Sequence, residues 1–549
     1  MHKIAVALIC LLLKPFCVEL TGQNDTISTS RQYVLDLKFV PDSGYIEGTA
    51  EIKDPDDSVF YLTKGLTLQS LSADGKRTGF RSTDNRDVPN SEKYSIDNVP
   101  GKLIIHFSGR IDPALYPKTI GALSMVNDRL IELSDHIDWY PRFERSAASD
   151  FIVSVDLPGS YTAVTNLERQ DEKKLHQRVI TQWRSEKPVY NLTLIAAPGF
   201  KIRNSDCAGY HLEICYTSLP GTYIDSMLGD LCKTVKLYTD LYGTDGAGKQ
   251  VRIVYSPRSA GGYARAPLLI VSEKFALEQR TLKYGFARDY RLNAHELAHY
   301  WSRADVNTAD DWINEGLAEF SALLASEKII GKEFSDVLLD EYKGIVNSTQ
   351  TEVPIMETTS GSWEREINRY YRPTLLFHDI RETYGDSMLF EFVKRLYENF
   401  TEKQSATTAV VLETLGDCFG VDEKEKFNEA LFKVPVISRQ SKNVQSDFDT
   451  LMIGAWVGQL TQFGQPAKFV LNLRNVDGKI VPTLDSPDQN AFDIPVTDLK
   501  IDNDSVFFVL GMAGATFTGS IDRSHLSIDG TWKQRGVDYP LFLKKEDTE

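Results

Sequence analysis

Residues 291–301 read RLNAHELAHYW and residues 312–320 read WINEGLAEF, and these two stretches decide how the whole chain is interpreted. The first stretch contains H-E-x-x-H within a run that is rich in helix-forming residues and free of Gly and Pro. His295 and His299 are four residues apart and share one helix face, so both imidazoles can bind a single zinc ion. Glu296 is close enough to act on a water molecule at that ion. The stretch predicts a zinc-binding helix, and a helix with two surface histidines is the competing interpretation.

A catalytic zinc ion needs a third protein ligand, and the second stretch offers two candidates. Glu315 and Glu319 are four residues apart, hence on one helix face, and can meet the first helix. Leu317, Phe320 and Leu323 belong to the expected buried stripe of this second helix. Taken alone, the two glutamates would be interpreted as surface residues. Beside an H-E-x-x-H motif, they indicate a metal site.

H-E-L-A-H followed by W-I-N-E-G resembles the zinc aminopeptidases of the alanyl aminopeptidase and leukotriene hydrolase family, whose pattern is H-E-x-x-H, a spacer and W-x-N-E-G. The resemblance implies that His295, His299 and Glu315 bind one zinc ion per chain and that Glu296 is the general base. Glu319 would steady the first histidine, as an acidic residue does in thermolysin-like enzymes. The spacer between His299 and Glu315 is about three residues shorter than in the family, so Glu319 stays the alternative ligand.

A second match to the same family lies at residues 369–377, which read RYYRPTLLF. They resemble the family's Y-x-K-G-A stretch, in which a tyrosine hydroxyl stabilises the developing oxyanion. The resemblance implies that Tyr370 has this catalytic role, with Tyr371 as the alternative. A tyrosine that only packs against the start of a helix is the competing interpretation.

The chain departs from the family in the stretch before the zinc motif. The best counterpart of the family's G-A-M-E-N is Gly261-Gly262-Tyr263-Ala264-Arg265. Its glycines would let a backbone edge lie close to an extended peptide, so Gly261, Gly262, Tyr263 and Arg265 are candidate substrate-binding residues. Arg265 would meet an acidic group or a substrate carbonyl, and a surface arginine is the competing interpretation. Ala264 occupies the position of the glutamate that captures the substrate's amino group. An alanine cannot pair with an ammonium, so we expect weak discrimination in favour of free amino termini.

The hydrophobic periodicity changes along the 549 residues, and these changes predict a multidomain α+β protein. Residues 23–205 contain alternating stretches broken by turn formers, which predicts an N-terminal antiparallel β domain. Residues 206–437 carry long runs with the helical period of 3.6 residues, which predicts a mostly helical domain. The resemblance implies that this domain is the thermolysin-like catalytic domain. Residues 438–447 are the expected linker to a C-terminal β domain at residues 448–549.

The C-terminal β domain is expected to contain about eight short strands, which predicts a small barrel or sandwich. Its strands would be separated by the turn pairs Asp477-Gly478, Asn503-Asp504 and Asp529-Gly530. It contains D-S-P-D-Q at residues 485–489 and I-D-G-T-W-K-Q at residues 528–534. With these stretches the domain is similar to a small β module that is appended to exported bacterial esterases. That similarity implies no function, and a binding role and a structural role are equally open.

The first 22 residues are typical of a secretory signal. Lys3 precedes an apolar run over residues 4–13 that is too short to span a bilayer, and no later segment is apolar enough to do so. We therefore expect an exported protein, secreted or periplasmic, without stable membrane insertion.

Four cysteines follow the predicted signal and allow two disulfides in three possible pairings. They are Cys207, Cys215, Cys232 and Cys418. The short spacing between the first two would suit a hairpin staple.

The net charge of −16 would repel a phosphate backbone, so we expect no nucleic-acid partner. The motifs instead predict an exported zinc-dependent metallopeptidase, aminopeptidase-like, that hydrolyses peptide substrates. Two alternatives remain open at this point. One is a catalytically weak or inactive homologue that binds peptides, and the other is a zinc hydrolase with a non-peptide substrate. The sequence leaves open the residue preference, the choice between exopeptidase and endopeptidase action, and the oligomeric state.

Overall fold

The computed structural model of the chain describes residues 31–55, 57–84, 90–116, 123–143, 148–243, 250–258, 262–301, 304–306, 308–349, 351–359, 364–403, 406–434, 450–462, 465–476, 479–487, 491–496, 498–502, 504–510, 515–534 and 537–546. The chain divides into two units. Unit 1 contains Asp230–Ala247 and Glu278–Glu549, and unit 2 contains Gln23–Gly229 and Gly248–Leu277. This division differs from the predicted domain limits, which stay a prediction.

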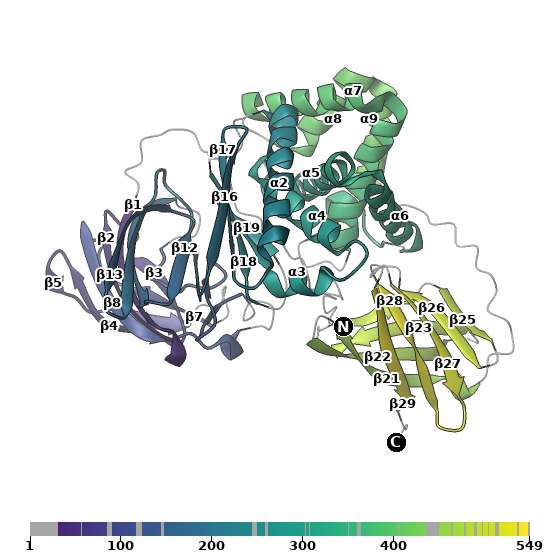
Figure 1. The fold of residues 1–549 in the computed structure, drawn as a ribbon, viewed down its shortest axis with the longest axis horizontal. Coiled ribbons are helices and arrows are strands. Elements are labelled where there is room, and N and C mark those ends of the chain that lie inside the picture. The colour runs from purple at the N-terminus through teal and green to yellow at the C-terminus, as the bar shows by residue number, and fades with distance from the viewer. Residues whose placement is uncertain are drawn as a thin grey trace. The chain divides into compact units, whose positions relative to one another are not determined.

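Unit 2 consists mainly of β-strands, as the alternating sequence pattern predicts (Figure 1). Their bounds are β1 (Arg31–Val40), β2 (Tyr45–Lys53), β3 (Val59–Thr63), β4 (Leu66–Ala73), β5 (Lys76–Arg77), β6 (Arg81–Asp84), β7 (Ser91–Ser95), β8 (Lys102–Arg110), β9 (Met125–Val126), β10 (Ile131–Leu133), β11 (Ser149–Pro158), β12 (Tyr161–Thr165), β13 (Glu168–Leu175), β14 (Arg178–Arg184), β15 (Leu194–Pro198), β16 (Lys201–Cys207), β17 (Tyr210–Tyr216), β18 (Gln250–Ser256), β19 (Gly262–Arg265) and β20 (Leu268–Ser272).

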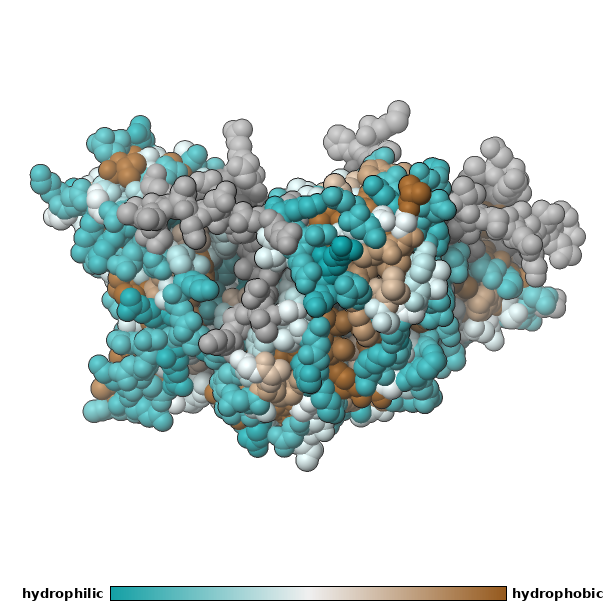
Figure 2. Space-filling model, turned by 90° about the horizontal axis from the view of Figure 1, so that it is seen from above, coloured by the Kyte–Doolittle hydropathy of each residue, from teal (hydrophilic) through white to brown (hydrophobic). Residues whose placement is uncertain are grey.

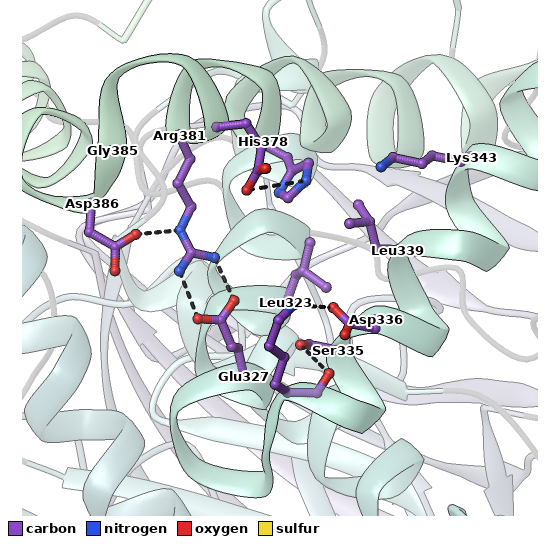
Figure 3. A pocket seen from close by; sticks show the side chains of 12 residues that line it. Leu323, Glu327, Ser335, Asp336, Leu339, Lys343, His378, Arg381, Gly385 and Asp386 are labelled. Carbon is purple, nitrogen blue, oxygen red and sulfur yellow. Dashed lines mark hydrogen bonds and ion pairs between the residues drawn. The ribbon is translucent and has the colours of Figure 1, made fainter.

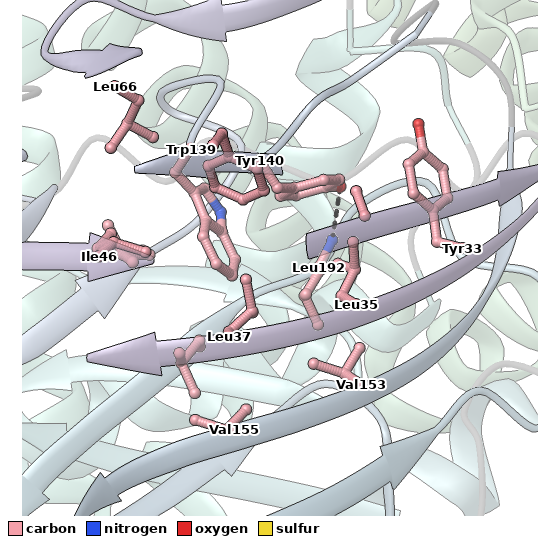
Figure 4. Close-up of a cluster of buried hydrophobic side chains, with 14 of the residues drawn as sticks. Tyr33, Leu35, Leu37, Ile46, Leu66, Trp139, Tyr140, Val153, Val155 and Leu192 are labelled. Carbon is pink, nitrogen blue, oxygen red and sulfur yellow. Dashed lines mark hydrogen bonds between the residues drawn. The ribbon is translucent and has the colours of Figure 1, made fainter. Parts of the chain in front are cut away.

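The largest sheet of unit 2 has the order β13-β14-β11-β1-β2-β8-β4-β5. Its neighbouring strands are antiparallel except for β1 and β11, which are parallel. Every second residue of β1 is buried, as the period of two requires. Tyr33, Leu35 and Leu37 thereby join Trp139 and Tyr140 in a buried hydrophobic cluster (Figure 4). This packing confirms the predicted N-terminal β domain.

Three smaller sheets complete unit 2, with the orders β12-β15-β10-β9, β3-β7-β6 and β16-β17-β18-β20-β19. The last of these is mixed: β17, β18 and β20 run parallel, and β19 closes one edge antiparallel to β20. The edge strand β19 carries most of the stretch that is the counterpart of G-A-M-E-N. Two helices, α2 (Gly221–Tyr242) and α3 (Glu273–Gln279), cross the division between the two units.

The middle part of unit 1 is helical, in agreement with the predicted period. Its α-helices are α4 (Gly285–Ala298), α5 (Asp311–Ala325), α6 (Lys332–Ser348), α7 (Arg372–Lys403), α8 (Thr408–Phe419) and α9 (Val421–Phe432). Helix α5 is buried along its whole length, so the stripe of leucines is only part of its buried surface. Helix α7 is interrupted at Gly385, whose φ of 81° and ψ of 167° are accessible to glycine but not to other residues without strain.

The C-terminal part of unit 1 is a single antiparallel sheet, curled into a half-barrel, with the strand order β24-β23-β22-β21-β29-β28-β27-β26-β25. The barrel alternative of the sequence analysis is therefore the closer one. The bounds are β21 (Gly454–Gln462), β22 (Gln465–Val476), β23 (Lys479–Ser486), β24 (Ala491–Pro495), β25 (Asp498–Asp502), β26 (Ser505–Leu510), β27 (Ala515–Asp522), β28 (Ser527–Gln534) and β29 (Val537–Lys545).

One predicted turn of this sheet is wrong, because Asp529 and Gly530 lie inside strand β28. A Cβ atom at Gly530 would be 2.5 Å from the ring of Phe517 and 2.5 Å from the carbonyl oxygen of Thr518, so the glycine serves close packing rather than a turn. The chain turns earlier, where the carboxylate of Asp522 accepts hydrogen bonds from two backbone N–H groups. The pair Asp477-Gly478 and residue Asn503 lie outside the described residues, as do the predicted signal and linker.

The cysteines correct a second expectation, the hairpin staple. Cys207 and Cys232 are disulfide-bonded, whereas Cys215 and Cys418 are free thiols. In the hairpin of β16 and β17, Cys207 lies beside the turn and Cys215 lies at the far end, opposite Ile202, so the two sulfur atoms cannot meet. The Cys215 thiol is buried in unit 2 instead.

The face of the molecule in Figure 2 is largely covered by hydrophilic residues, with hydrophobic residues visible between them. Among the helices that the structure describes, none combines the length and the hydropathy that a membrane crossing requires.

Candidate metal centre

Helices α4 and α5 bring three predicted ligands together in unit 1. The Nε2 atoms of His295 and His299 are 3.2 Å apart, and each lies 3.5 Å from Oε2 of Glu315. A tetrahedral zinc ion with bonds of about 2.0–2.1 Å has ligand separations of about 3.3–3.4 Å. The three observed separations fit that tetrahedron. At most 6% of each ligand residue is exposed, which excludes the interpretations as surface histidines and surface glutamates.

The charges around these side chains favour a cation. Burial opposes protonation of His295, but the carboxylates of Glu315 and Glu319 outweigh it and raise its pKa to about 9. At His299 burial is the largest effect and lowers the pKa to about 4. Burial would raise the pKa of Glu315, but His295, His299 and the nearby Arg365 hold it at about 2. Glu315 is thus an anion beside two imidazoles, which is a donor set that suits zinc.

Glu319 lies at the opposite nitrogen of the first histidine. Its Oε2 is 2.9 Å from His295 Nδ1, while the candidate metal position is on the Nε2 side. Arg291 binds both carboxylate oxygens of Glu319, and Tyr342 donates a further hydrogen bond. Burial would raise the pKa of Glu319, but Arg291 and His295 lower it well below its usual value. This geometry suits a residue that orients the histidine, and it makes Glu315 the better candidate for the third ligand.

The sequence motifs do not indicate two supporting residues of this group, Arg291 and Tyr342. Arg291 precedes His295 by four residues and shares its helix face, which is a signal that could have identified it. Tyr342 lies on α6 and approaches Glu319 only through tertiary packing, so no local pattern indicates it.

The candidate general base, Glu296, is fully buried on α4 next to His295. Its negative charge contributes to the raised pKa of His295. The position agrees with its place in the H-E-x-x-H motif, between the two ligands in the sequence.

The two candidate tyrosines face different surroundings, although they are consecutive in the π-helical segment Ile367–Tyr371. The ring of Tyr370 stacks on the His295 ring, with centroids 5.7 Å apart and an angle of 11° between the planes. The ring of Tyr371 stacks on Tyr342, and its hydroxyl donates to Glu366. Of the two, Tyr370 is therefore the tyrosine that lies beside the candidate metal centre.

The predicted substrate-binding residues lie on β19 in unit 2, except Gly261, which is outside the described residues. The hydroxyl of Tyr263 donates to Glu132, and the guanidinium of Arg265 donates to Asp135 over 2.7 Å. Burial would raise the pKa of Asp135, but Arg265 holds it well below its usual value. The acidic partner expected for Arg265 is thus a residue of the N-terminal β domain. The contribution of β19 to substrate binding stays a prediction.

A separate groove of about 410 Å³ lies in unit 1 between α6 and α7 (Figure 3). Five of its charged side chains bind one another: Arg381 contacts Glu327 and Asp386, and Lys332 contacts Asp336. None of the three candidate ligands lines this groove. The buried triad consequently remains the better candidate for chemistry.

No family model and no curated protein matches this chain at a significant level. Solved structures do match its fold. The M1 zinc metallopeptidase from Deinococcus radiodurans is 17% identical, with a TM-score of 0.54 over 74% of this chain and 94% of that chain. A variant of that enzyme bound to a Tyr-Ser-Ala substrate is 17% identical, with a TM-score of 0.55 over 74% and 95% of the two chains. A variant of a two-domain M1 zinc metallopeptidase bound to L-tryptophan is 16% identical, with a TM-score of 0.54 over 74% of this chain and 96% of that chain.

These likenesses establish the fold over about three quarters of the chain: it is that of an M1 zinc metallopeptidase. They confirm the multidomain α+β class that the sequence predicts. The buried His-His-Glu group is consistent with zinc in such a fold.

Proposed function

We propose that this chain is a zinc-dependent peptidase that hydrolyses peptide bonds. One observation carries the proposal: His295, His299 and Glu315 are buried at the mutual separations of a tetrahedral zinc site. The fold supports it, because a similar solved enzyme binds the peptide Tyr-Ser-Ala.

In this proposal each residue has one chemical task. When bound to the triad, Zn²⁺ supplies Lewis acidity, which polarises a carbonyl group and makes water more acidic. Glu296 accepts a proton from the attacking water and returns it to the leaving amine. Tyr370 donates a hydrogen bond to the oxygen on which negative charge develops. Glu319 keeps His295 in the orientation that presents Nε2.

We also propose that a free amino terminus is not required in the substrate. Ala264 has no carboxylate to bind an ammonium, and it stands where the resembled family has a glutamate. Cleavage of peptides with blocked amino ends follows from the absence of this carboxylate.

Export, to the outside of the cell or to the periplasm, is part of the same proposal. The signal-like first 22 residues support it, and so do the disulfide-bonded Cys207 and Cys232, because disulfides persist in oxidising compartments.

The test is to digest a mixed peptide library with the purified zinc-loaded protein and to identify the products by mass spectrometry. Glu296→Gln is the matched control, because it keeps the ligands and removes the proposed base. Cleavage by the wild type that is lost in Glu296→Gln supports the proposal. Stoichiometric zinc with peptide binding but no cleavage would favour an inactive homologue. Stoichiometric zinc with cleavage of ester substrates alone would favour a non-peptide hydrolase.

A further inference from the structure

Arg365 contacts two members of the candidate site at once, although no motif points to it. Its Nη2 atom lies 3.0 Å from Oε1 of Glu315, and its Nη1 atom donates to the hydroxyl oxygen of Tyr370 over 3.1 Å. The side chain is 18% exposed, so it is largely shielded from water. One guanidinium thus joins the proposed third ligand to the proposed oxyanion donor.

The contact with Glu315 assigns different tasks to the two carboxylate oxygens. Oε1 accepts a hydrogen bond from Arg365, while Oε2 faces the Nε2 atoms of His295 and His299. A glutamate that rotates freely would present either oxygen to a metal ion. Because Arg365 holds Oε1, it fixes the carboxylate in the orientation that directs Oε2 at the metal position.

The contact with Tyr370 affects the proton of the phenol. A hydroxyl oxygen that accepts a hydrogen bond from a guanidinium directs its own O–H at a different acceptor. The positive charge beside the phenol also strengthens it as a donor. Both effects prepare Tyr370 to donate to a substrate oxygen.

Arg365 is itself held in place by a charge. Its Nη2 lies 3.4 Å from Oδ2 of Asp311, and the same Oδ2 is bound by Arg369. Only the planar fork of an arginine reaches a carboxylate and a hydroxyl simultaneously, and a lysine ammonium cannot replace it in both contacts.

We propose that Arg365 is a positioning residue that acts through Glu315 on metal affinity and through Tyr370 on turnover. We call the effect on turnover the Tyr370 arm of the inference and the effect on metal affinity its Glu315 arm. The inference rests on the proposed function, because the Tyr370 arm requires a reaction with an oxyanion. The Glu315 arm requires only that the triad binds zinc.

The test compares Arg365→Met and Arg365→Lys with Arg381→Met. Arg381 is the matched control because it also contacts two carboxylates in unit 1, but it lies in the separate groove and touches none of the ligands. Zinc affinity is measured by competition with a chromophoric chelator. We expect both Arg365 variants to bind zinc about 10–100-fold more weakly than the wild type, and Arg381→Met to bind it within about threefold.

Turnover at saturating zinc then isolates the second arm. We expect Arg365→Met to lower kcat by about 10²-fold with KM nearly unchanged, and to lower it by less than about threefold in the Tyr370→Phe background. The inference would be overturned if the kcat losses of Arg365→Met and Tyr370→Phe multiply in the double variant. It would also be overturned if Arg365→Met binds zinc as tightly as Arg381→Met does. If Arg365→Met fails to fold, as judged by circular dichroism, Arg365→Lys decides by the same two measurements. A wild type that binds zinc but cleaves no peptide would refute the proposed function and with it the Tyr370 arm, while the affinity comparison would still decide the Glu315 arm.

Discussion

Replacing Glu319 by Gln tests whether Glu319 orients His295, as we propose, or is itself a metal ligand. The side chain is fully buried and contacts Arg291, Tyr342 and His295. Glutamine keeps the size of the side chain but removes its charge, so the Arg291 guanidinium, which is 15% exposed, loses its compensating anion. His295 loses the carboxylate at Nδ1.

The contacts give the magnitude of both effects. Breaking a buried ion pair by removing one partner costs about 3–5 kcal/mol in the free energy of unfolding. Removing the outer partner of a metal-binding histidine weakens the metal by about 10–100-fold. Glu319→Gln should therefore destabilise the metal-free protein by several kcal/mol, and should still bind about one zinc ion per chain when zinc is abundant. Glu315→Gln should lose zinc binding, because it removes a ligand.

The assay is urea unfolding of the metal-free protein combined with zinc titration calorimetry. Glu327→Gln is the control, since Glu327 also accepts two hydrogen bonds from one arginine, Arg381, but is partly exposed and outside the site. It should cost about 0.2–1 kcal/mol and leave zinc binding unchanged. If Glu319→Gln abolishes zinc binding and Glu315→Gln retains it, the assignment of the third ligand is wrong.

The remaining predictions concern metal, base, substrate and pH. The purified protein should carry about one Zn²⁺ per chain by elemental analysis and lose activity to a chelator; activity without zinc contradicts the mechanism. Glu296→Gln should keep its zinc while kcat falls at least about 10²-fold, and a variant without zinc would show that Glu296 is a ligand. The cleavage rate of an N-acetylated decapeptide, followed by mass spectrometry, should be within about tenfold of the rate for the free-amine form, which is a preference below about 1.4 kcal/mol. Strict release of single N-terminal residues would refute this. Burial lowers the pKa of His136 to about 3. Between about pH 6.5 and 3 the unfolded state therefore binds more protons than the folded state. The free energy of unfolding decreases as the pH falls through this window, by up to about 1.4 kcal/mol per pH unit. His136→Gln should flatten the fall in thermal midpoint between pH 7 and 5, and an unchanged slope would count against this account.

The candidate metal centre could be predicted from the sequence largely because its pieces are local. H-E-x-x-H places His295 and His299 on one turn of a helix, and W-I-N-E-G places Glu315 on the next helix. Whether Glu315 or Glu319 meets the metal depends on the crossing of these helices, which the sequence alone does not fix. In the structure Glu315 faces the Nε2 atom of His295, whereas Glu319 faces its Nδ1 atom.

The partners of these residues could not be predicted, because they come from distant parts of the chain. Arg365 meets Glu315 across 50 residues, and Tyr342 meets Glu319 across 23. Asp529-Gly530 has the composition of a turn, but the close packing of Phe517 and Thr518 against Gly530 in the neighbouring strand places the pair inside β28. In both cases tertiary packing overrides or supplements the local signal.

The strand order of the half-barrel has a consequence for how the sheet is assembled during synthesis. Strand β29 is the last of the nine to leave the ribosome, yet it lies in the middle of the sheet, between β21 and β28. Until it is made, β21 to β24 and β25 to β28 are two separate half-sheets, each with an open edge. A nascent chain stalled before Val537, or a nonsense mutation there, would leave two unpaired edges prone to aggregation. The nine residues Val537–Lys545 are thus needed to join the sheet.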